Sequence, residues 1–263
     1  MILRRITKHV TNQNWFAVFI DFIIVVFGVY MGLQVQQWSQ NMSSRAEEVR
    51  VLRTMTADIN ADIIAINSAL DRIYIENDSR KRVIQYTQGI EGAMPEEDFH
   101  HHIKMGVWQF TTFKPAQTTL DELKSSAKIN QIGSPKLRNK IQEYYNILGD
   151  HVTDTENLKH IVLTFVDPFL VENHDMSLMF ERSTDKEIVE LNKLYRDTEP
   201  VINHEAMKSQ KFRNIVLQVA VASIDATQGI NRILKVYQEM LVLIEERLDE
   251  LGTSQKPTIK EIN

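Results

Sequence analysis

The sequence predicts an all-α protein in which a single N-terminal transmembrane helix continues into an elongated antiparallel helical bundle or coiled coil. Three observations lead to this fold class. An apolar stretch of about 20 residues, the length that spans a bilayer, lies near the N-terminus. Periodic apolar positions follow it. The 263 residues include only 9 Gly and 6 Pro, so residues that end helices are scarce.

The apolar stretch runs from Trp15 to Val35, and its only strongly polar side chains are Asp21 and Gln34. We predict a transmembrane helix over residues 15–37 because this length crosses about 30 Å of hydrocarbon. The alternatives are a buried core helix, which would have a polar face, and a cleaved signal peptide. The sequence Gln34-Val35-Gln36 is a poor cleavage site.

Side chains within and around this span suggest roles beyond anchoring. Trp15 and Trp38 bracket it, where indole rings mark the two membrane interfaces. Gly28 and Gly32 form a small-xxx-small pair that lets another helix approach closely. The Asp21 carboxylate either reaches the nearby interface or pairs with a basic side chain of a neighbouring subunit. The expected partners are the lipid bilayer and either further copies of the chain or other membrane-protein subunits.

Basic residues do not decide the orientation of the span, because three lie on each side of it: Arg4, Arg5 and Lys8 before, and Arg45, Arg50 and Arg53 after. A short basic tail, residues 1–14, before an uncleaved anchor favours a cytoplasmic N-terminus and a periplasmic helical domain. The chain has no cysteine, which excludes disulfides and thiolate chemistry. The net charge of −5 argues against nucleic-acid binding.

Residues 38–252 are predicted to form the helical domain, with long helices over about 38–88, 135–172 and 204–251. The first is expected to be continuous with the anchor, because no Gly or Pro lies between Leu33 and Gln88. Its apolar positions alternate by three and four, as in a heptad repeat. They are Val49, Leu52, Thr56, Ile59, Ile63, Ile66, Leu70 and Ile73.

The other two long helices show similar stripes and clear end signals. Ser134-Pro135 is an N-cap followed by proline at the first helical position, and Pro168 is expected to kink or end this helix. Gly252 is expected to follow the last helix as its C′ residue. The two stripes are Leu137, Ile141, Tyr144, Leu148, Leu158, Val162, Phe165 and Phe169, and then Phe212, Val219, Ala226, Ile233, Tyr237, Ile244, Leu248 and Leu251.

Shorter pieces connect the long helices. Residues 89–133 are predicted to form a cap of short helices at the membrane-distal end, where Thr119-x-x-Glu122 is a capping box. Another short helix is expected to start at Thr184. Residues 253–263 are polar and are expected to be a flexible tail.

Two stretches resemble a family of uncharacterised bacterial single-span membrane proteins, and together they cover about half the chain. The first is the span with its early acidic residue, its two glycines and the closing sequence Gln34-Val35-Gln36-Gln37-Trp38. The second runs from Thr118 to Ile129 and is followed by Leu137-Arg138 and Tyr144-Tyr145. Here Leu120 and Ala127 replace the aromatic residue and the glycine usual in the family. The resemblance implies a single-pass topology in the bacterial inner membrane and implies no reaction.

No pattern in the sequence predicts an enzyme or a cofactor. Three histidines, His100, His101 and His102, are the candidates for a metal site, but consecutive helical residues point about 100° apart and do not converge on one ion. We therefore predict no metal site. The group Trp108, Phe110 and Phe113 is either the core of the cap or a hydrophobic patch that docks a partner or a small ligand.

These features favour a membrane-anchored structural or accessory protein that assembles with itself or with a larger membrane complex. The alternative is a periplasmic sensory or ligand-binding domain, which would need a partner subunit because only about 14 residues would face the cytoplasm. A weaker possibility is a tether on the cytoplasmic side, should the orientation be reversed.

Overall fold

The structure, a computed structural model, describes residues 15–90, 94–116, 118–126, 128–195 and 201–252, and it confirms the all-α prediction. No strand occurs among these residues; one isolated bridge joins His174 and Ile202. The helices are α2 (Trp15–Thr87), α3 (Glu96–Ile103), η1 (Lys104–Trp108), α4 (Thr118–Ser125), η2 (Lys128–Gln131), α5 (Pro135–Ile161), η3 (Val162–Val166), α6 (Asp167–Asn173), η4 (Met176–Phe180), α7 (Lys186–Tyr195), α8 (His204–Met207) and α9 (Gln210–Glu250).

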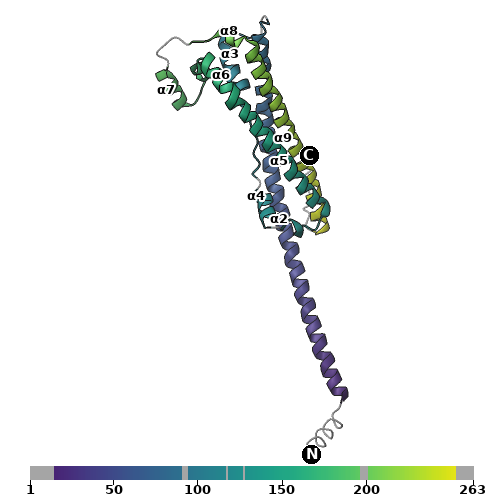
Figure 1. Cartoon of the computed structure of the whole chain (residues 1–263). Helices are drawn as coiled ribbons and strands as arrows, with labels where there is room; N and C mark the ends of the chain where they lie inside the picture. Colours follow the sequence, from purple (N-terminus) through teal and green to yellow (C-terminus); the bar gives the residue numbers. More distant parts are fainter. Residues whose placement is uncertain (1–14, 91–93, 117, 127, 196–200, 253–263) are drawn as a thin grey trace, which may run out of the picture. The chain divides into compact units, whose positions relative to one another are not determined.

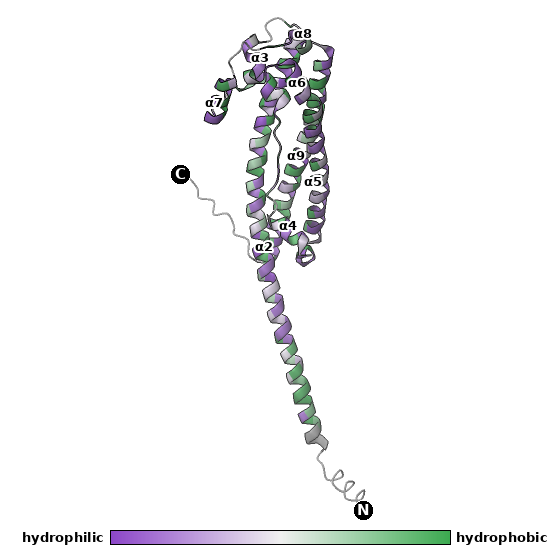
Figure 2. Cartoon of the chain, turned by 60° about the vertical axis from the view of Figure 1, so that its left-hand side comes forward, coloured by the Kyte–Doolittle hydropathy of each residue, from purple (hydrophilic) through white to green (hydrophobic). Residues whose placement is uncertain are grey.

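The chain divides into two compact units, residues 1–51 and 52–263. The first contains the N-terminal part of α2, which is long and apolar enough to cross a membrane by length and composition. No residue of its most apolar window is buried. Figure 2 shows this apolar stretch in green. Residues 1–14 and 253–263, predicted to be the tails, lie outside the described part of the chain.

Within the second unit, α2, α5 and α9 contribute long segments that pack side by side (Figure 1). Ion pairs fix α5 and α9 as antiparallel, since Lys140 pairs with Glu239 and Asp150 with Arg232. The caps expected from the sequence are present. The Ser134 hydroxyl accepts from the backbone N–H of Leu137, and Gly252, with φ of +72°, follows the last turn of α9.

The buried face of α2 differs from the predicted heptad repeat at every second position. Leu52, Ile59, Ile66 and Ile73 are buried as expected. Between them the structure buries Met55, Asp62 and Ala69, with Glu76 after them, and leaves Thr56, Ile63 and Leu70 half-buried. The prediction therefore lies one residue too late at every second position, and it did not expect the two carboxylates, Asp62 and Glu76, in the buried repeat.

The end of α2 is a Schellman turn. The N–H of Gly89 donates to Tyr86 O at 3.0 Å and that of Ile90 to Gln85 O at 3.2 Å. Gly89 has φ of +72°, a left-handed conformation that glycine adopts without steric cost. The helix therefore ends at the glycine that the sequence indicated.

Pro168 neither ends nor simply kinks the second long helix. A proline lacks an N–H and clashes with the carbonyl four residues earlier. The preceding turn, η3, is π-helical, and the N–H of Asp167 bonds to Val162 O. The wider turn shifts later side chains by about 100°. Val166 is therefore buried, while Phe165, which the predicted stripe placed inside, is 45% exposed.

The expected helix over 204–251 is interrupted near its start. The short helix α8 ends at Met207, and Ser209 then caps α9 by accepting from the N–H of Phe212 at 3.1 Å. The short helix expected from Thr184 begins two residues later, as α7.

Residues 89–133 do not form one cap. Helix α3 and turn η1 lie beside η4 and η3, near one end of α5, while α4 lies near the other end (Figure 1). Residues 109–116, here called the strap, run along α2 between them. Thr111 contacts Glu76, and the N–H of Ala116 donates to Asp62 Oδ1 at 3.0 Å.

The predicted capping box at Thr119 is also wrong. Helix α4 already begins at Thr118, so Thr119 lies inside its first turn. The Thr119 hydroxyl instead donates to Asp58 Oδ2 at 2.5 Å, and its N–H donates to the same oxygen at 3.2 Å. The Asp58 carboxylate of α2 thus accepts from an N–H of the first turn of α4, the role that a capping side chain would have, and it fixes the far end of the strap.

Candidate functional site

A cavity of about 530 Å³ lies where α2, η1, the strap, η3 and α6 meet. Its size falls within the range of small-molecule sites. Most of the lining is apolar, with a few polar side chains. The lining residues are Arg72, Ile75, Glu76, Met105, Trp108, Gln109, Phe110, Thr111, Val162, Leu163 and Asp167.

Two π-helical turns contribute to the wall of this cavity. Met105 and Trp108 belong to η1, and Val162 and Leu163 belong to η3, more than 50 residues later. Such turns are rare in proteins and occur frequently at functional sites. Their meeting at one cavity is the strongest structural indication of function among the described residues.

Trp108 is fixed from two sides. Its indole Nε1 donates to Asp167 Oδ1 at 2.7 Å, which joins the end of η1 to the start of α6. The Trp108 ring also meets the Phe180 ring edge to face, with centroids 5.7 Å apart. The indole therefore presents a preformed surface to the cavity, and the Asp167 carboxylate is engaged.

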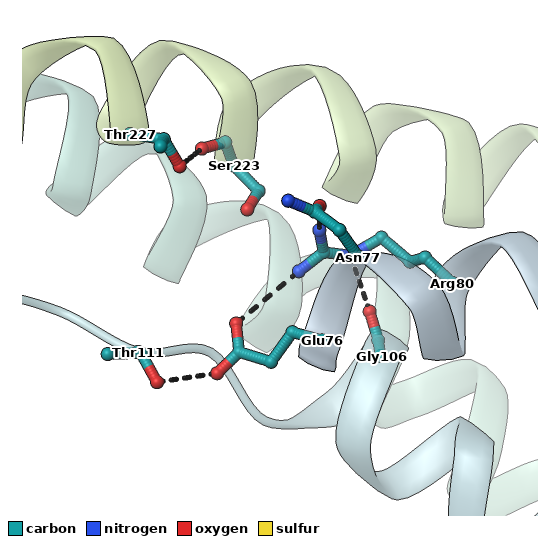
Figure 3. Close-up of polar contacts among 7 residues, drawn as sticks. All are labelled: Glu76, Asn77, Arg80, Gly106, Thr111, Ser223 and Thr227. Carbon is teal, nitrogen blue, oxygen red and sulfur yellow. Dashed lines mark hydrogen bonds and ion pairs between the residues drawn. The ribbon is translucent and has the colours of Figure 1, made fainter. Parts of the chain in front are cut away.

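Glu76, one of the lining residues, forms a buried ion pair with Arg80 in α2 (Figure 3). Glu76 and Arg80 are 4% and 2% exposed. Glu76 Oε1 accepts from the Thr111 hydroxyl at 2.6 Å, which holds the strap. Arg80 Nε donates to Gly106 O at 2.6 Å, which holds η1. One pair thus positions two walls of the cavity.

The pair itself is long, with 3.6 Å between Glu76 Oε2 and Arg80 Nη2. Neither atom has a hydrogen-bond partner among the described residues. Burial raises the pKa of Glu76, against the opposing effects of the Thr111 hydrogen bonds and the Arg80 charge. Burial also lowers the pKa of Arg80. The geometry suits a structural pair that fixes the strap and η1.

Close packing of η1 on α2 depends on Gly106. A Cβ at this position would lie 2.6 Å from the backbone nitrogen of Arg80 and 2.9 Å from the carbonyl carbon of Ser79. Only a residue without a side chain allows this approach, because backbone atoms cannot move aside cheaply. The Gly106 carbonyl therefore reaches the Arg80 guanidinium directly.

The predicted histidine candidates do not converge. His100 is buried, with Nδ1 2.9 Å from Nε2 of His174, and His102 Nδ1 lies 3.1 Å from Ser79 Oγ. Asp98 pairs with Arg182 at 2.6 Å. The described residues contain no group of three or more potential metal ligands.

Three histidines of this region, His101, His102 and His174, favour their neutral forms. Burial, followed by the charge of His100, lowers the pKa of His174 to about 4. Burial also lowers the pKa of His101 and of His102. The sequence did not single out His174, which lies 74 residues from its partner His100 and shares no local pattern with it.

The aromatic group is divided by the fold. Trp108 and Phe110 line the cavity, whereas Phe113 is buried at 6% exposure, and its carbonyl oxygen lies 3.1 Å from His151 Nε2. His151 is buried as well. A single docking patch that includes Phe113 is therefore not formed.

The positions singled out in the apolar segment all lie in the first unit. An added Cβ at Gly28 or Gly32 would meet no atom within 4 Å. Asp21 is exposed, and Trp38 is 65% exposed. The side chain of Trp15, the first residue of α2, lies outside the described part. The segment is therefore open to an external partner at both glycines.

A second polar cluster that the sequence did not reveal joins the three long helices. The Tyr237 hydroxyl donates to Asp62 Oδ2 at 2.8 Å and lies 3.0 Å from the Tyr144 hydroxyl. Burial raises the pKa of both tyrosines, so both stay neutral. Asp62 occupies a buried position of the α2 repeat, and this polar residue at a heptad position is the signal that could have located the cluster.

Comparisons with models of protein families, with curated proteins and with solved structures found no match to this chain.

Proposed function

We propose that this chain is a membrane-anchored accessory protein that assembles with copies of itself or with other membrane subunits. One observation carries the proposal: the apolar side chains from Phe19 to Val35 are exposed throughout. So large an apolar surface is unfavourable in water and suits lipid and a neighbouring helix. We place the segment as a single span of the bacterial inner membrane, in agreement with the resemblance to single-span bacterial membrane proteins.

Features along α2 support contact with a partner helix. Gly28 and Gly32 lie on one side of the helix and leave open space around them. Asp21 supplies a carboxylate that a basic side chain of a second subunit would satisfy. In the other unit, the buried spacing of three and four supports coiled-coil packing of the long helices.

The assembly is tested by native mass measurement of the full chain in lipid nanodiscs. Replacing Gly28 and Gly32 with leucine should block close helix approach and raise the dissociation constant of the complex about tenfold. Val26→Leu, on nearly the opposite face, is the control and should leave the complex intact. The proposal would be contradicted if the wild-type chain is strictly monomeric and retains no other membrane protein.

A second function, ligand binding by the helical domain, is favoured by the cavity between η1 and η3. In this proposal the domain lies in the periplasm and acts through a partner subunit. The chain purified from its native membrane should then retain a small molecule that Leu163→Trp displaces by filling the cavity. Leu163 is 56% exposed, so the larger ring can be accommodated without disturbing the core. An unchanged ligand content in this variant would argue against the cavity as the site.

A further inference from the structure

The walls of the cavity select a ligand with an apolar body. The indole of Trp108 is held in place by Asp167 and Phe180, so its surface is preformed. Around it lie aliphatic and thioether groups, namely Ile75, Met105, Val162 and Leu163. A flat or aliphatic moiety would replace water over these side chains, which is favourable in proportion to the apolar area covered.

The charged groups of the lining are not equivalent. Asp167 already accepts from the Trp108 indole. Glu76 already accepts from Thr111 and lies beside Arg80, its internal counter-charge. Arg72 is exposed, and no hydrogen bond or close ion pair joins it to a described residue, although its charge acts on Glu76. Among the charged side chains of the lining, the one without such a bond is therefore a guanidinium.

From this arrangement, and resting on the proposed ligand-binding function, we infer that the cavity binds a small amphiphilic monocarboxylate. Its carboxylate pairs with Arg72 and its apolar body lies against Trp108. A guanidinium pairs with a carboxylate through two parallel hydrogen bonds. An amine would be repelled by the Arg72 cation, and one oxygen of each acid already accepts a hydrogen bond. A second carboxylate on the ligand would approach Glu76 and Asp167, so a monoanion fits best.

The test compares three probes that share one body and differ in the head group: phenylbutyrate, phenylbutanol and phenylbutylamine. The full chain in nanodiscs carries Trp15→Phe and Trp38→Phe, so that Trp108 is the single fluorophore. Nanodiscs without protein correct for partition into lipid. We expect phenylbutyrate to change the Trp108 emission with an affinity about tenfold higher than phenylbutanol, and phenylbutylamine to bind most weakly.

Substitution of Arg72 measures the contribution of the ligand's head group to affinity separately from the contribution of its apolar body. Arg72→Gln should abolish the preference for the carboxylate and leave the affinity for phenylbutanol unchanged. Arg82→Gln, an exposed arginine of α2 outside the cavity lining, is the matched control and should keep the preference. Leu163→Phe, which narrows the cavity and keeps Trp108 as the single tryptophan, should weaken binding of all three probes.

The outcomes distinguish failure of the monocarboxylate assignment from failure of the proposed ligand-binding function. Equal binding of the alcohol or amine, or a carboxylate preference that survives Arg72→Gln, overturns the monocarboxylate assignment and leaves the cavity as a ligand site. Absence of binding by every probe contradicts both the assignment and the ligand-binding function.

Discussion

At the scale of single residues, Arg80 and Glu76 contribute most to the position of η1 and the strap. The Arg80 guanidinium is almost wholly removed from water and is held by the Gly106 carbonyl, by Asn77 and by Glu76. Removing two charges from water is costly, and mutual attraction offsets the cost only in part. The main effect of the pair is therefore to specify where η1 and the strap dock, and its net contribution to stability is smaller. Each charge needs the other, because a single buried charge would be uncompensated.

We expect Arg80→Leu to lower the free energy of unfolding by about 3–5 kcal/mol, because it leaves Glu76 buried without its counter-charge. The free energy of unfolding should fall less in the double variant Glu76→Leu/Arg80→Leu than in this single variant. Arg82→Leu, two residues along the same helix, removes an exposed pair with Asp78 and should lower the free energy of unfolding far less. Urea unfolding followed by helical circular dichroism measures all three, and equal losses for the two arginines would refute the assignment.

The lowered pKa of His174 predicts that the stability of the fold depends on pH. Burial lowers its pKa from an ordinary 6.5 to about 4 in the folded protein. Between these values the unfolded chain binds more protons, so stability is fully present above pH 6.5 and is lost as the pH falls toward 4. The slope should reach about 1.4 kcal/mol per pH unit.

This dependence is measured as the urea midpoint at pH 7.5, 6 and 5, values chosen at roughly unit intervals across the titration of a histidine. His174→Gln should flatten the decline, leaving the smaller contribution of His101 and His102, whose pKa values are also lowered. His160→Gln, at an exposed position of α5, is the control and should leave the slope unchanged. A wild-type midpoint that does not move between pH 7.5 and 5 would contradict the prediction.

At the scale of helices, the close contact between η1 and α2 depends on one glycine. Gly106→Ala should lower the unfolding free energy by about 1–3 kcal/mol, because its methyl group would press on the backbone of Ser79 and Arg80. Gly149→Ala in α5, where an added Cβ meets nothing within 4 Å, should instead raise it by about 0.5–1 kcal/mol. Thermal unfolding of the two variants gives the comparison. Similar shifts in one direction would show that the close approach is absent.

The same helices show what the sequence could and could not predict. Heptad spacing predicted half of the buried positions of α2 between residues 52 and 76, such as Leu52 and Ile59, since apolar burial dominates the pattern. It missed Asp62 and Glu76, because a pattern of apolar residues does not count carboxylates as buried, and their hydrogen-bond donors Tyr237 and Thr111 are distant in sequence. It misplaced Phe165, because a π-helical turn changes the register without any change in composition.

The cavity was less predictable than the helices. Trp108 and Phe110 were proposed as a patch from their composition, and both line the cavity. Its other walls come from α2, η3 and α6, and they meet only after the strap has turned the chain back along α2. Asp167, which fixes the indole, lies 59 residues from Trp108, a separation that no local pattern records.

At the scale of the whole molecule, two surfaces of opposite character share one chain. The first unit exposes a continuous apolar helix, whereas the long helices of the second bury their apolar faces and add carboxylates that hold the strap. Such a division suits a protein that meets lipid through one unit and water through the other. On which side of the membrane the second unit lies is a separate prediction.

We predict that the helical domain lies in the periplasm, and the absence of cysteine makes this directly measurable, because an introduced thiol is the only one in the chain. Lys186→Cys places it at an exposed position of α7, and Asn12→Cys places it in the N-terminal tail. A membrane-impermeant maleimide should label the first in intact spheroplasts and the second only after permeabilisation. Labelling after permeabilisation gives the reference for each thiol. The reverse pattern would place the domain in the cytoplasm and favour a tether on that side, because the span would then run in the opposite direction.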